Sequence, residues 1–371
     1  MQKKTILLIF ILMSTVILFA VGCSGGASDS AEETLPLDLN SLSLDELISL
    51  AQEDGEVQSV GMPDDWANWE ETWADIASIY GLKHADVDMS SAEELALFEA
   101  EKNNATKDIG DVGQAFGPIA VERGLTLPYK TSYWDSIPSW AKDRDGHWII
   151  AYYGTMALLS NLDIVDAAPK SFDDIMNGDY IVAVGDVTKA NQAQIALLSV
   201  ALAYGGSESN VMPGLEFFRT LAEQGRLDLG EMTPARMEKG EIAVCFLWDY
   251  NALGYRDNFL VNNPNANFAV HIPREAAIQS GYTTVINAYT KRPYAAALTR
   301  EFILSDKGQI NLARGYAKPV RDVELPADLK AKLIDDAEYA NAGMIKDATA
   351  WEATTKSLGQ LWQEEVLAYA R

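Results

Sequence analysis

The stretch GHWIIAYYGTMALLSN, residues 146–161, decides the fold together with a second stretch, SGYTTVINAY, at residues 280–289. The first is apolar nearly throughout, as a β-strand covered on both faces must be. The second alternates Tyr, Thr, Val and Asn around smaller residues, which also predicts a strand. We expect both strands to carry the chain between two lobes, with a ligand cleft between those lobes.

A chain of 371 residues exceeds the size at which a single core usually stops growing, so two lobes are expected. From Gly55 onward the pattern repeats strand, loop and helix, which predicts an α/β sheet with ligand loops at the carboxyl ends of its strands. The expected boundaries are 44–150 together with 288–371 for lobe 1, and 151–287 for lobe 2.

Two helix starts are predicted from local signals in the first lobe. Pro63, Asp64 and Asp65 offer an N-cap, and the spacing of the Trp residues after them indicates one face of a helix. Ser90 or Ser91 is expected to cap the next helix, with Glu93 or Glu94 completing a capping box.

The composition excludes several classes of function. Acidic residues number 54 against 29 basic ones, and the formal charge of −25 repels nucleic acid and anionic membranes. Only two cysteines occur, Cys23 and Cys245, and they do not resemble a disulfide framework. The three histidines are scattered singly, so neither a metal site nor a cofactor is expected.

The N-terminus has the layout of a secretory signal. Lys3 and Lys4 precede an uncharged, mostly apolar run over residues 5–21, followed by Gly22 and Cys23. The end of this run resembles the lipobox of bacterial lipoproteins, which implies a signal peptide over 1–22 and a diacylated Cys23. Residues 23–43 then form a tether, rich in small and acidic residues at its start. A transmembrane helix with an incidental cysteine is the alternative.

The chain as a whole resembles the substrate-binding lipoproteins of bacterial ABC importers, over about residues 50–320. The run AAALTREFILSDKGQINLARG, residues 295–315, is similar to a stretch of the iron, polyamine and phosphonate binders of that superfamily. The resemblance implies a type II periplasmic-binding-protein fold, in which two α/β lobes joined by two crossing strands close on a small solute. It further implies a monomer, not an enzyme, anchored outside the cell membrane and delivering its solute to an ABC permease and ATPase.

Candidate ligand contacts on the first lobe lie where that family places its ligand loops. Asp65 and Trp66 pair an acid with an indole face, which suits a cationic amine through charge pairing and cation–π attraction. Their alternative roles are helix capping and packing. Asp111 is placed at the cleft by topology, as is Tyr282 of the second crossing strand.

The second lobe contributes two further groups and one tyrosine. Thr188, Lys189 and Asn191 start a long helix and are candidates for holding a phosphonate or carboxylate; plain N-capping is the alternative. Trp248 and Asp249 end a strand and resemble the amine-binding pair of polyamine binders, whereas a buried Trp with a surface Asp is the other interpretation. Of Tyr152 and Tyr153 only one can face the cleft, and Tyr153 is named as the contact.

These residues together favour an amine-bearing solute, an aminoalkylphosphonate or a polyamine, over a sugar or iron. A lipid-anchored secreted α/β enzyme, such as a carboxylate-dependent hydrolase, is the competing interpretation. Against it stands the absence from the sequence of the nucleophile-elbow, zinc-protease, P-loop and dinucleotide motifs. A structural lipoprotein or adhesin is a third possibility, and it predicts no ligand-driven closure.

Overall fold

The computed structural model describes residues 37–370. The expected signal peptide, Cys23 and most of the expected tether lie outside these residues, so lipidation of Cys23 stays a prediction. Among the helices of the described part, none combines the length and the apolar character needed to span a bilayer.

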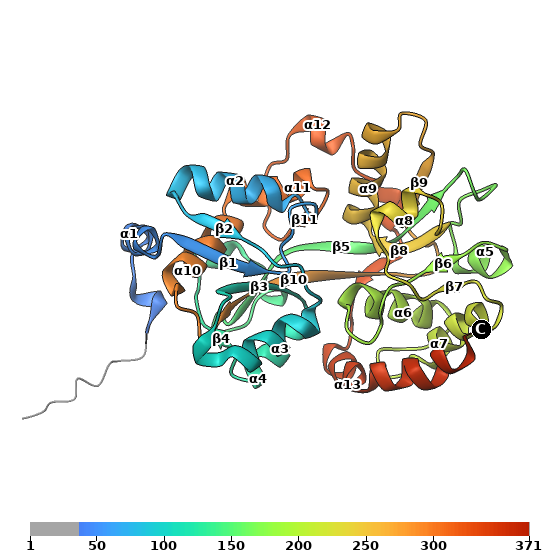
Figure 1. Ribbon diagram of the computed structural model, residues 1–371, viewed down its shortest axis with the longest axis horizontal. Helices are drawn as coiled ribbons and strands as arrows, with labels where there is room; N and C mark the ends of the chain where they lie inside the picture. Colours follow the sequence, from blue (N-terminus) through green and yellow to red (C-terminus); the bar gives the residue numbers. More distant parts are fainter. Residues whose placement is uncertain (1–36, 371) are drawn as a thin grey trace, which may run out of the picture. The chain divides into compact units, whose positions relative to one another are not determined.

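Two long antiparallel strands form the centre of the sheet. They are β5 (Trp148–Asn161) and β10 (Ala277–Asn287), and Figure 1 shows both running from one side of the folded body to the other. Tyr282 of β10 pairs with Tyr152 of β5, and the register shifts between Tyr282 and the next residue. Nearly every side chain of the two strands is buried, which confirms the prediction of two crossing strands.

The main path of the sheet has the order β2-β1-β3-β10-β5-β8-β6-β7. Outside the two central strands the pairings within each side are parallel. The outer strands are β1 (Glu56–Val60), β2 (Lys83–Ala85), β3 (Ile109–Gly113), β6 (Val182–Ala183), β7 (Leu227–Asp228) and β8 (Val244–Trp248). We call the side with β1, β2 and β3 the first half and the side with β6, β7 and β8 the second half. Parallel strands place their loops at one edge, where ligands of open α/β sheets bind.

Short strands extend the two central ones. β4 and β12 pair with β10, whereas β9 and β11 pair with β5. Their bounds are Thr126–Leu127 for β4, Phe268–His271 for β9, Lys318–Pro319 for β11 and Ala342–Met344 for β12.

Helices cover both faces of the sheet in the first half (Figure 1). They are α1 (Leu44–Asp54), α2 (Trp69–Tyr80), α3 (Ser91–Glu101), α4 (Phe116–Glu122), α10 (Pro293–Ile303) and α11 (Asp306–Arg314). The predicted capping box of α3 is present: the Glu93 carboxylate accepts hydrogen bonds from the Ser90 amide at 3.0 Å and from the Ser90 hydroxyl at 2.7 Å. This capping fixes the first turn of α3, which carries Glu94.

Helix α2 begins later than the sequence predicts. Its N-cap is Asn68, not a residue of 63–65, and both Ala67 (φ 49°) and Asn68 (φ 61°) have left-handed backbone. Gly315 packs against this bend so closely that a Cβ on it would lie 2.4 Å from the Ala67 carbonyl carbon. The segment before Asn68 is therefore a loop, and Trp66 belongs to this loop and not to α2.

The second half has helices α5 (Phe172–Asn177), α6 (Asn191–Ala203), α7 (Met212–Glu223), α8 (Pro234–Glu238) and α9 (Asp249–Asn262). Helix α6 is buried along most of its length, which agrees with its mostly apolar sequence from Ile195 onward. Helix α9 is absent from the expectations above. Its sequence has no apolar period, and it starts directly at the end of β8 without a side-chain cap.

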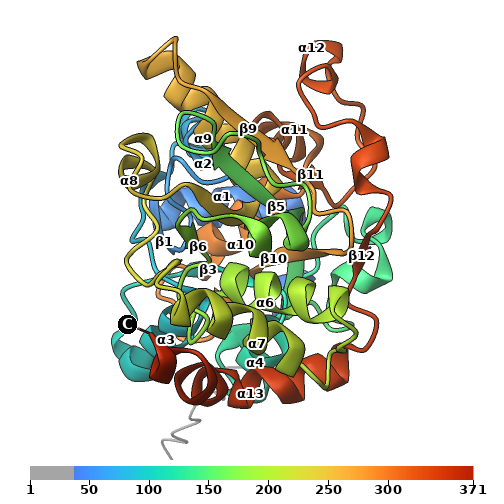
Figure 2. The ribbon, with the colours of Figure 1, turned by 90° about the vertical axis from the view of Figure 1, so that its right-hand side faces the viewer.

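The C-terminal segment departs from the expected lobe boundaries. After α12 (Ala327–Lys330), the last long helix, α13 (Ala348–Glu365), packs on α7 of the second half (Figure 2). Phe218 and Trp362 meet edge to face at 5.6 Å, and Arg219 Nε donates to the Glu365 carbonyl at 2.6 Å. The buried side of α13 thus finds its apolar partner in the second half, whereas 288–371 was assigned entirely to the first lobe.

A single buried arginine joins α10 to both central strands. Arg300 donates hydrogen bonds to the carbonyl oxygens of Gly146 at 2.9 Å, His147 at 3.2 Å and Thr284 at 2.7 Å. Burial lowers the pKa of its guanidinium to about 9. These bonds fix the first-half ends of β5 and β10 relative to each other.

Candidate ligand-binding site

Five aromatic side chains converge where the central strands pass between the two halves, and we call them the aromatic cluster. They come from the loop after β1, from the two central strands and from the junction of β8 with α9: Trp66, Tyr152, Trp248, Tyr250 and Tyr282. Trp66 lies edge-on to Tyr250 at 5.7 Å and to Tyr282 at 5.5 Å, and Tyr152 stacks on Tyr282 at 5.7 Å. Tyr152 and Trp248 have no exposed surface. The cluster therefore presents several ring faces and edges in a dry environment.

Two buried carboxyl groups of the first half lie near this cluster: Asp111 contacts it directly, and Glu94 lies against Gly110 on the other face of β3. Tyr152 donates its hydroxyl proton to Asp111 Oδ2 at 2.6 Å, and the Trp66 indole N–H donates to the Tyr152 oxygen at 2.7 Å. Glu94 Oε2 accepts the backbone N–H of Asp111 at 3.1 Å. Both acids are 1% exposed.

Burial governs the protonation of this acid pair. It raises the pKa of Asp111 and of Glu94 well above their ordinary values, and the nearby Asp111 charge raises the pKa of Glu94 further. Neither carboxyl group has a cationic side chain within ion-pair distance in residues 37–370. A cation beside Asp111 would lower the pKa of its carboxyl group and favour the charged form.

Asn191, the first residue of α6, approaches β3 from the second half. It is 2% exposed, and neither atom of its amide has a hydrogen-bond partner in the described structure. A Cβ on Gly113 would lie 2.2 Å from Asn191 Cγ, so only glycine allows this approach of β3 to α6. Because Asp111 and Gly113 are two residues apart on β3, both face the side of the sheet that Asn191 approaches.

Further polar atoms in the same region are buried without a partner. Asp111 Oδ1 and the Tyr250 hydroxyl make no hydrogen bond within residues 37–370. Native structures pair nearly all buried polar atoms, so unpartnered acceptors and donors around one aromatic cluster indicate a binding site for a polar ligand.

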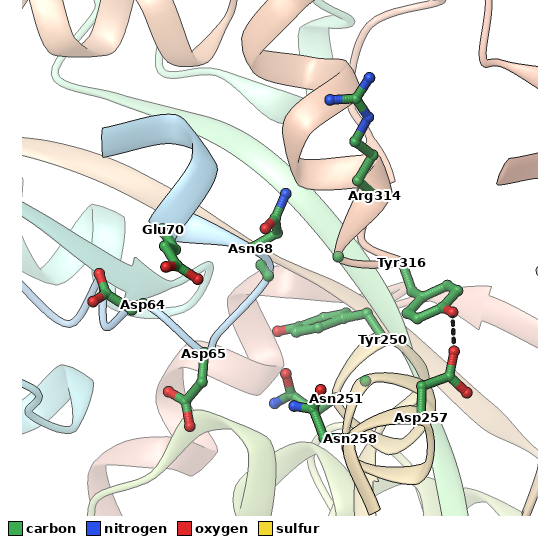
Figure 3. Close-up of a pocket in the computed structure, with 13 residues that line it drawn as sticks. Asp64, Asp65, Asn68, Glu70, Tyr250, Asn251, Asp257, Asn258, Arg314 and Tyr316 are labelled. Carbon is green, nitrogen blue, oxygen red and sulfur yellow. Dashed lines mark hydrogen bonds between the residues drawn. The ribbon is translucent and has the colours of Figure 1, made fainter. Parts of the chain in front are cut away.

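An open cavity of about 320 Å³ adjoins the cluster (Figure 3), and we call it the acidic pocket. Its walls come from the start of α2 and the loop before it, from the first three turns of α9 and from the end of α11 with the residues after it: Asp64, Asp65, Ala67, Asn68, Glu70, Tyr250, Asn251, Gly254, Asp257, Asn258, Arg314, Gly315 and Tyr316. Tyr250 belongs to both the cluster and the pocket. The pocket therefore lies between the two halves, beside the aromatic cluster.

The structure brings together six of the residues predicted from the sequence. Trp66, Asp111, Asn191, Trp248 and Tyr282 lie in or against the aromatic cluster, and Asp65 lines the acidic pocket. Trp248 contributes through its indole N–H, which donates to the Tyr282 hydroxyl at 3.3 Å.

Tyr153 lies on the opposite side of β5 from the cluster. Its ring packs edge to face against Trp140 at 5.8 Å, and Tyr152 is the member of the pair that enters the cluster. The two tyrosines thus face opposite sides of β5, as the alternation of a strand predicts, and the one at the cluster is Tyr152.

Asp249 is a buried structural acid, because α9 begins at this residue and turns its carboxylate toward β5. Its Oδ1 accepts the amides of Thr155 at 2.9 Å and Tyr250 at 3.0 Å, and its Oδ2 accepts the Tyr339 hydroxyl at 2.9 Å. Burial raises its pKa, which the Lys318 ammonium partly offsets. Both oxygens are occupied, so Asp249 has no free acceptor of the kind that Asp111 retains.

The predicted anion site before α6 is not assembled. Thr188 donates its hydroxyl and its amide to Asp186 Oδ1, at 2.6 and 2.9 Å, in a local turn. The Lys189 ammonium lies 2.9 Å from Glu93 Oε1 on the first half. These groups therefore satisfy one another, and only Asn191 of the three reaches the cluster.

Sequence reasoning missed Glu94, Tyr152 as the facing tyrosine, Tyr250 and Asn251. The burial of Glu94 depends on two glycines, since a Cβ on Gly61 or Gly110 would lie 2.4 or 2.7 Å from its carboxylate oxygens. That packing requires knowledge of which strands are neighbours. Among the described residues, no group of His, Cys, Asp and Glu has the arrangement of a metal site.

The sheet order, the two crossing strands and a polar site between the halves define an α/β periplasmic-binding-protein fold of the type II class. A profile of the family described as "Bacterial extracellular solute-binding protein" matches residues 104–343, and the chain belongs to this family. It is accordingly a solute-binding protein, and this family consists of binding proteins.

Solved structures share the fold at low sequence identity. The Atu4243 GABA receptor is 17% identical, with 83% of this chain and 96% of that chain covered at a TM-score of 0.62. AfuA from Actinobacillus pleuropneumoniae, with fructose-6-phosphate bound, is 18% identical (84% and 98% covered, TM-score 0.66). The ferric binding protein from Campylobacter jejuni is 18% identical (83% and 98%, TM-score 0.63). No curated protein matches the sequence at a significant level.

Proposed function

We propose that this protein captures a small amine-bearing solute between its two halves and delivers it to an ABC permease and its ATPase. The observation that carries the proposal is the buried carboxyl group of Asp111, which lies against the aromatic cluster without a cationic partner. An ammonium group supplies what this arrangement lacks, because it has a positive charge and three hydrogen-bond donors.

The aromatic rings add to the attraction of the acids. A cation over the face of a Trp or Tyr ring gains ~0.5 to 2 kcal/mol, with the larger values in desolvated sites. Trp66 comes from the first half, whereas Trp248 and Tyr250 come from the second, so a bound cation would contact both halves. Such contacts favour the closed form, because a ligand shifts a conformational equilibrium only through its different affinity for the two states.

The environment of Lys189 bears on the choice between the two favoured ligand classes. An aminoalkylphosphonate needs a cationic or amide-rich partner for its anionic end, and Lys189 is paired with Glu93. Of the predicted anion-binding residues, only the Asn191 amide stays without a partner. The geometry thus supports binding of an ammonium group more strongly than binding of a phosphonate group.

The relatives named above do not fix the ligand. Their descriptions name GABA, fructose-6-phosphate and ferric ion, which share no single chemistry. The proposal therefore rests on the residues of this site.

The remaining parts of the proposal concern placement in the cell. We infer a signal peptide over 1–22, a diacylated Cys23 and a tether over 23–43, which together would hold a monomer on the extracytoplasmic side of the membrane. Lobe 1 would consist of residues 44–150 and of the segment from residue 288 to the end of α11. Lobe 2 would consist of residues 151–287, with α13 packed on it. The central strands β5 and β10 would act as the hinge.

A thermal-shift screen tests the proposal. Primary amines, polyamines, aminoalkylphosphonates, sugar phosphates, thiamine and ferric citrate are compared, with neutral alcohols of matched length as controls. A ligand present at 100 times its dissociation constant stabilises the fold by ~2.7 kcal/mol. Stabilisation by amines but not by alcohols is expected. Stabilisation by sugar phosphates or ferric citrate alone would contradict an amine ligand.

A further inference from the structure

The acidic pocket carries negative charge that the protein does not neutralise. The carboxylates of Asp64, Asp65 and Glu70 make no hydrogen bond or ion pair within residues 37–370. The other two charged side chains of the pocket are already paired. Asp257 bonds Arg256 at 2.7 Å and accepts the Tyr316 hydroxyl, and Arg314 pairs with Glu71. The free charge facing the cavity is therefore acidic.

Buried polar atoms provide a second, independent observation. Asn251 Nδ2 and the Tyr250 hydroxyl have no partner in the described structure, although these residues are only 3% and 1% exposed. Both residues line the acidic pocket, and Figure 3 shows them between the α9 turn and the Asp65 loop. A half-turn of the Asn251 amide presents either its oxygen or its nitrogen to a ligand.

The backbone of the pocket wall is held in uncommon conformations. Ala67, Asn68 and Tyr316 all have positive φ, at 49°, 61° and 67°. Residues of this kind cost of order 1–3 kcal/mol each and concentrate at ligand sites, where the surroundings hold them in place. Here Gly315 holds the Ala67 bend from the other side of the pocket.

Tyr250 connects this pocket to the aromatic cluster. Its ring lies 5.7 Å from Trp66 and 5.6 Å from Tyr152, whose hydroxyl reaches Asp111. An alkyl chain that starts at Asp111 and follows the rings of Trp66 and Tyr250 would therefore end in the acidic pocket.

We infer that the acidic pocket is a second subsite, which binds the distal ammonium group of an elongated diamine whose first ammonium lies at Asp111. This inference rests on the proposed function, since it assigns the other end of the same amine ligand. A carboxylate or phosphonate at the distal end would meet the unpaired charges of Asp65 and Glu70 and be repelled.

The test compares monoamines with diamines of equal chain length by calorimetric titration of the purified full-length chain. The probes are butylamine against 1,4-diaminobutane, pentylamine against 1,5-diaminopentane, and hexylamine against 1,6-diaminohexane. We expect the best diamine to bind at least about fivefold more tightly than its monoamine, as ~1 kcal/mol from partly exposed charges allows. The preference should shrink between low and high salt, because exposed charges are screened.

A charge-matched pair of double variants locates the effect. Asp65→Asn with Glu70→Gln should remove the diamine preference and leave monoamine affinity unchanged. Glu216→Gln with Glu223→Gln, on the exposed face of α7, removes the same charge and should keep the preference. Monoamine binding without any diamine preference, or a preference that survives the pocket variant, would overturn this inference alone. Failure of every amine to bind the wild-type chain would overturn it together with the proposed function.

Discussion

The Tyr152 hydroxyl donates a hydrogen bond of 2.6 Å to Asp111 Oδ2, so the crossing strand β5 orients the buried acid of β3 from two strands away. Tyr282 of the intervening strand stacks on the Tyr152 ring. Motion of the two central strands would therefore move the groups that surround Asp111. This connection offers a direct physical link between the occupancy of the site and the relative position of the two halves.

Asp111→Asn should weaken amine binding and stabilise the ligand-free protein. A charge-assisted hydrogen bond contributes about 1.5 to 3 kcal/mol, so affinity should fall roughly tenfold to a hundredfold. The melting temperature of the ligand-free variant should rise, because the substitution removes a carboxyl group whose charged form is penalised by burial. Titration calorimetry and thermal unfolding measure the two effects.

The matched control for that variant is Asp249→Asn. Its carboxylate is bonded to Thr155, Tyr250 and Tyr339, so this change should lower the melting temperature. Affinity for the amine, corrected for the folded fraction, should change much less than in Asp111→Asn. A larger affinity loss in Asp249→Asn than in Asp111→Asn would move the site away from the acid pair.

The amine affinity should increase as the pH rises from about 4 toward the raised pKa values of the two buried acids. Ordinary carboxyl pKa values lie near 4, and burial raises those of Asp111 and Glu94 in the folded state. The stability contributed by a raised pKa is complete below the unfolded value and is lost as pH rises through the folded value. The ligand-free protein thus loses stability in this window, while ammonium binding recovers it by favouring the charged carboxylates.

The difference between wild type and Asp111→Asn isolates this effect. His84 acts in the opposite direction, since burial lowers its pKa to about 4 and protonation from pH 6.5 downward costs stability. His84 is present in both proteins, so its contribution cancels in the difference. The advantage of the variant in ligand-free melting temperature should grow as pH rises; a pH-independent difference would show that Asp111 does not titrate in this range.

Breaking the Lys189–Glu93 ion pair should weaken binding only a little. The two residues join the halves at 2.9 Å, with 44% and 48% of their side chains exposed, and exposed pairs contribute up to ~1 kcal/mol. Lys189→Ala should therefore reduce amine affinity at most about fivefold, and less at high salt. Glu93→Gln should have no additional effect in the Lys189→Ala background. Complete loss of binding in Lys189→Ala would restore the anion-binding hypothesis for this residue.

The fold could be predicted from the sequence because its two decisive strands carry an unusually apolar pattern. Residues 146–161 have to be covered on both faces, and β5 is buried from end to end apart from two partly exposed positions. The Ser90–Glu93 capping box was equally local and is present. Signals of this kind depend only on neighbouring residues.

Positions that depend on the phase of a strand could not be predicted. The alternation of β5 allows only one of Tyr152 and Tyr153 at the cleft, but the choice depends on the register with β10, which shifts after Tyr282. The Glu94 carboxylate is buried because Gly61 and Gly110 leave room for it. Predicting its burial would require knowing that α3 packs against these two glycines. Long-range packing decides both cases.

Helix α9 shows a different limit. Residues 249–262 contain a glycine and several asparagines without an apolar period, so no helix was expected there. The helix forms because tertiary contacts outweigh its weak local preference. Its start turns Asp249 into the interior, where its carboxylate is bonded within the protein, and turns Tyr250 toward the cluster.

The most direct test of the central claim is a calorimetric titration of the wild-type protein with butylamine and with 1-butanol, repeated with Asp111→Asn. The two probes have the same chain length and differ in charge, so the comparison isolates the acid pair. We predict one-site binding of the amine, at least tenfold weaker binding of the alcohol, and loss of this discrimination in the variant. Equal binding of amine and alcohol, or discrimination that persists without the Asp111 carboxylate, would contradict the assignment.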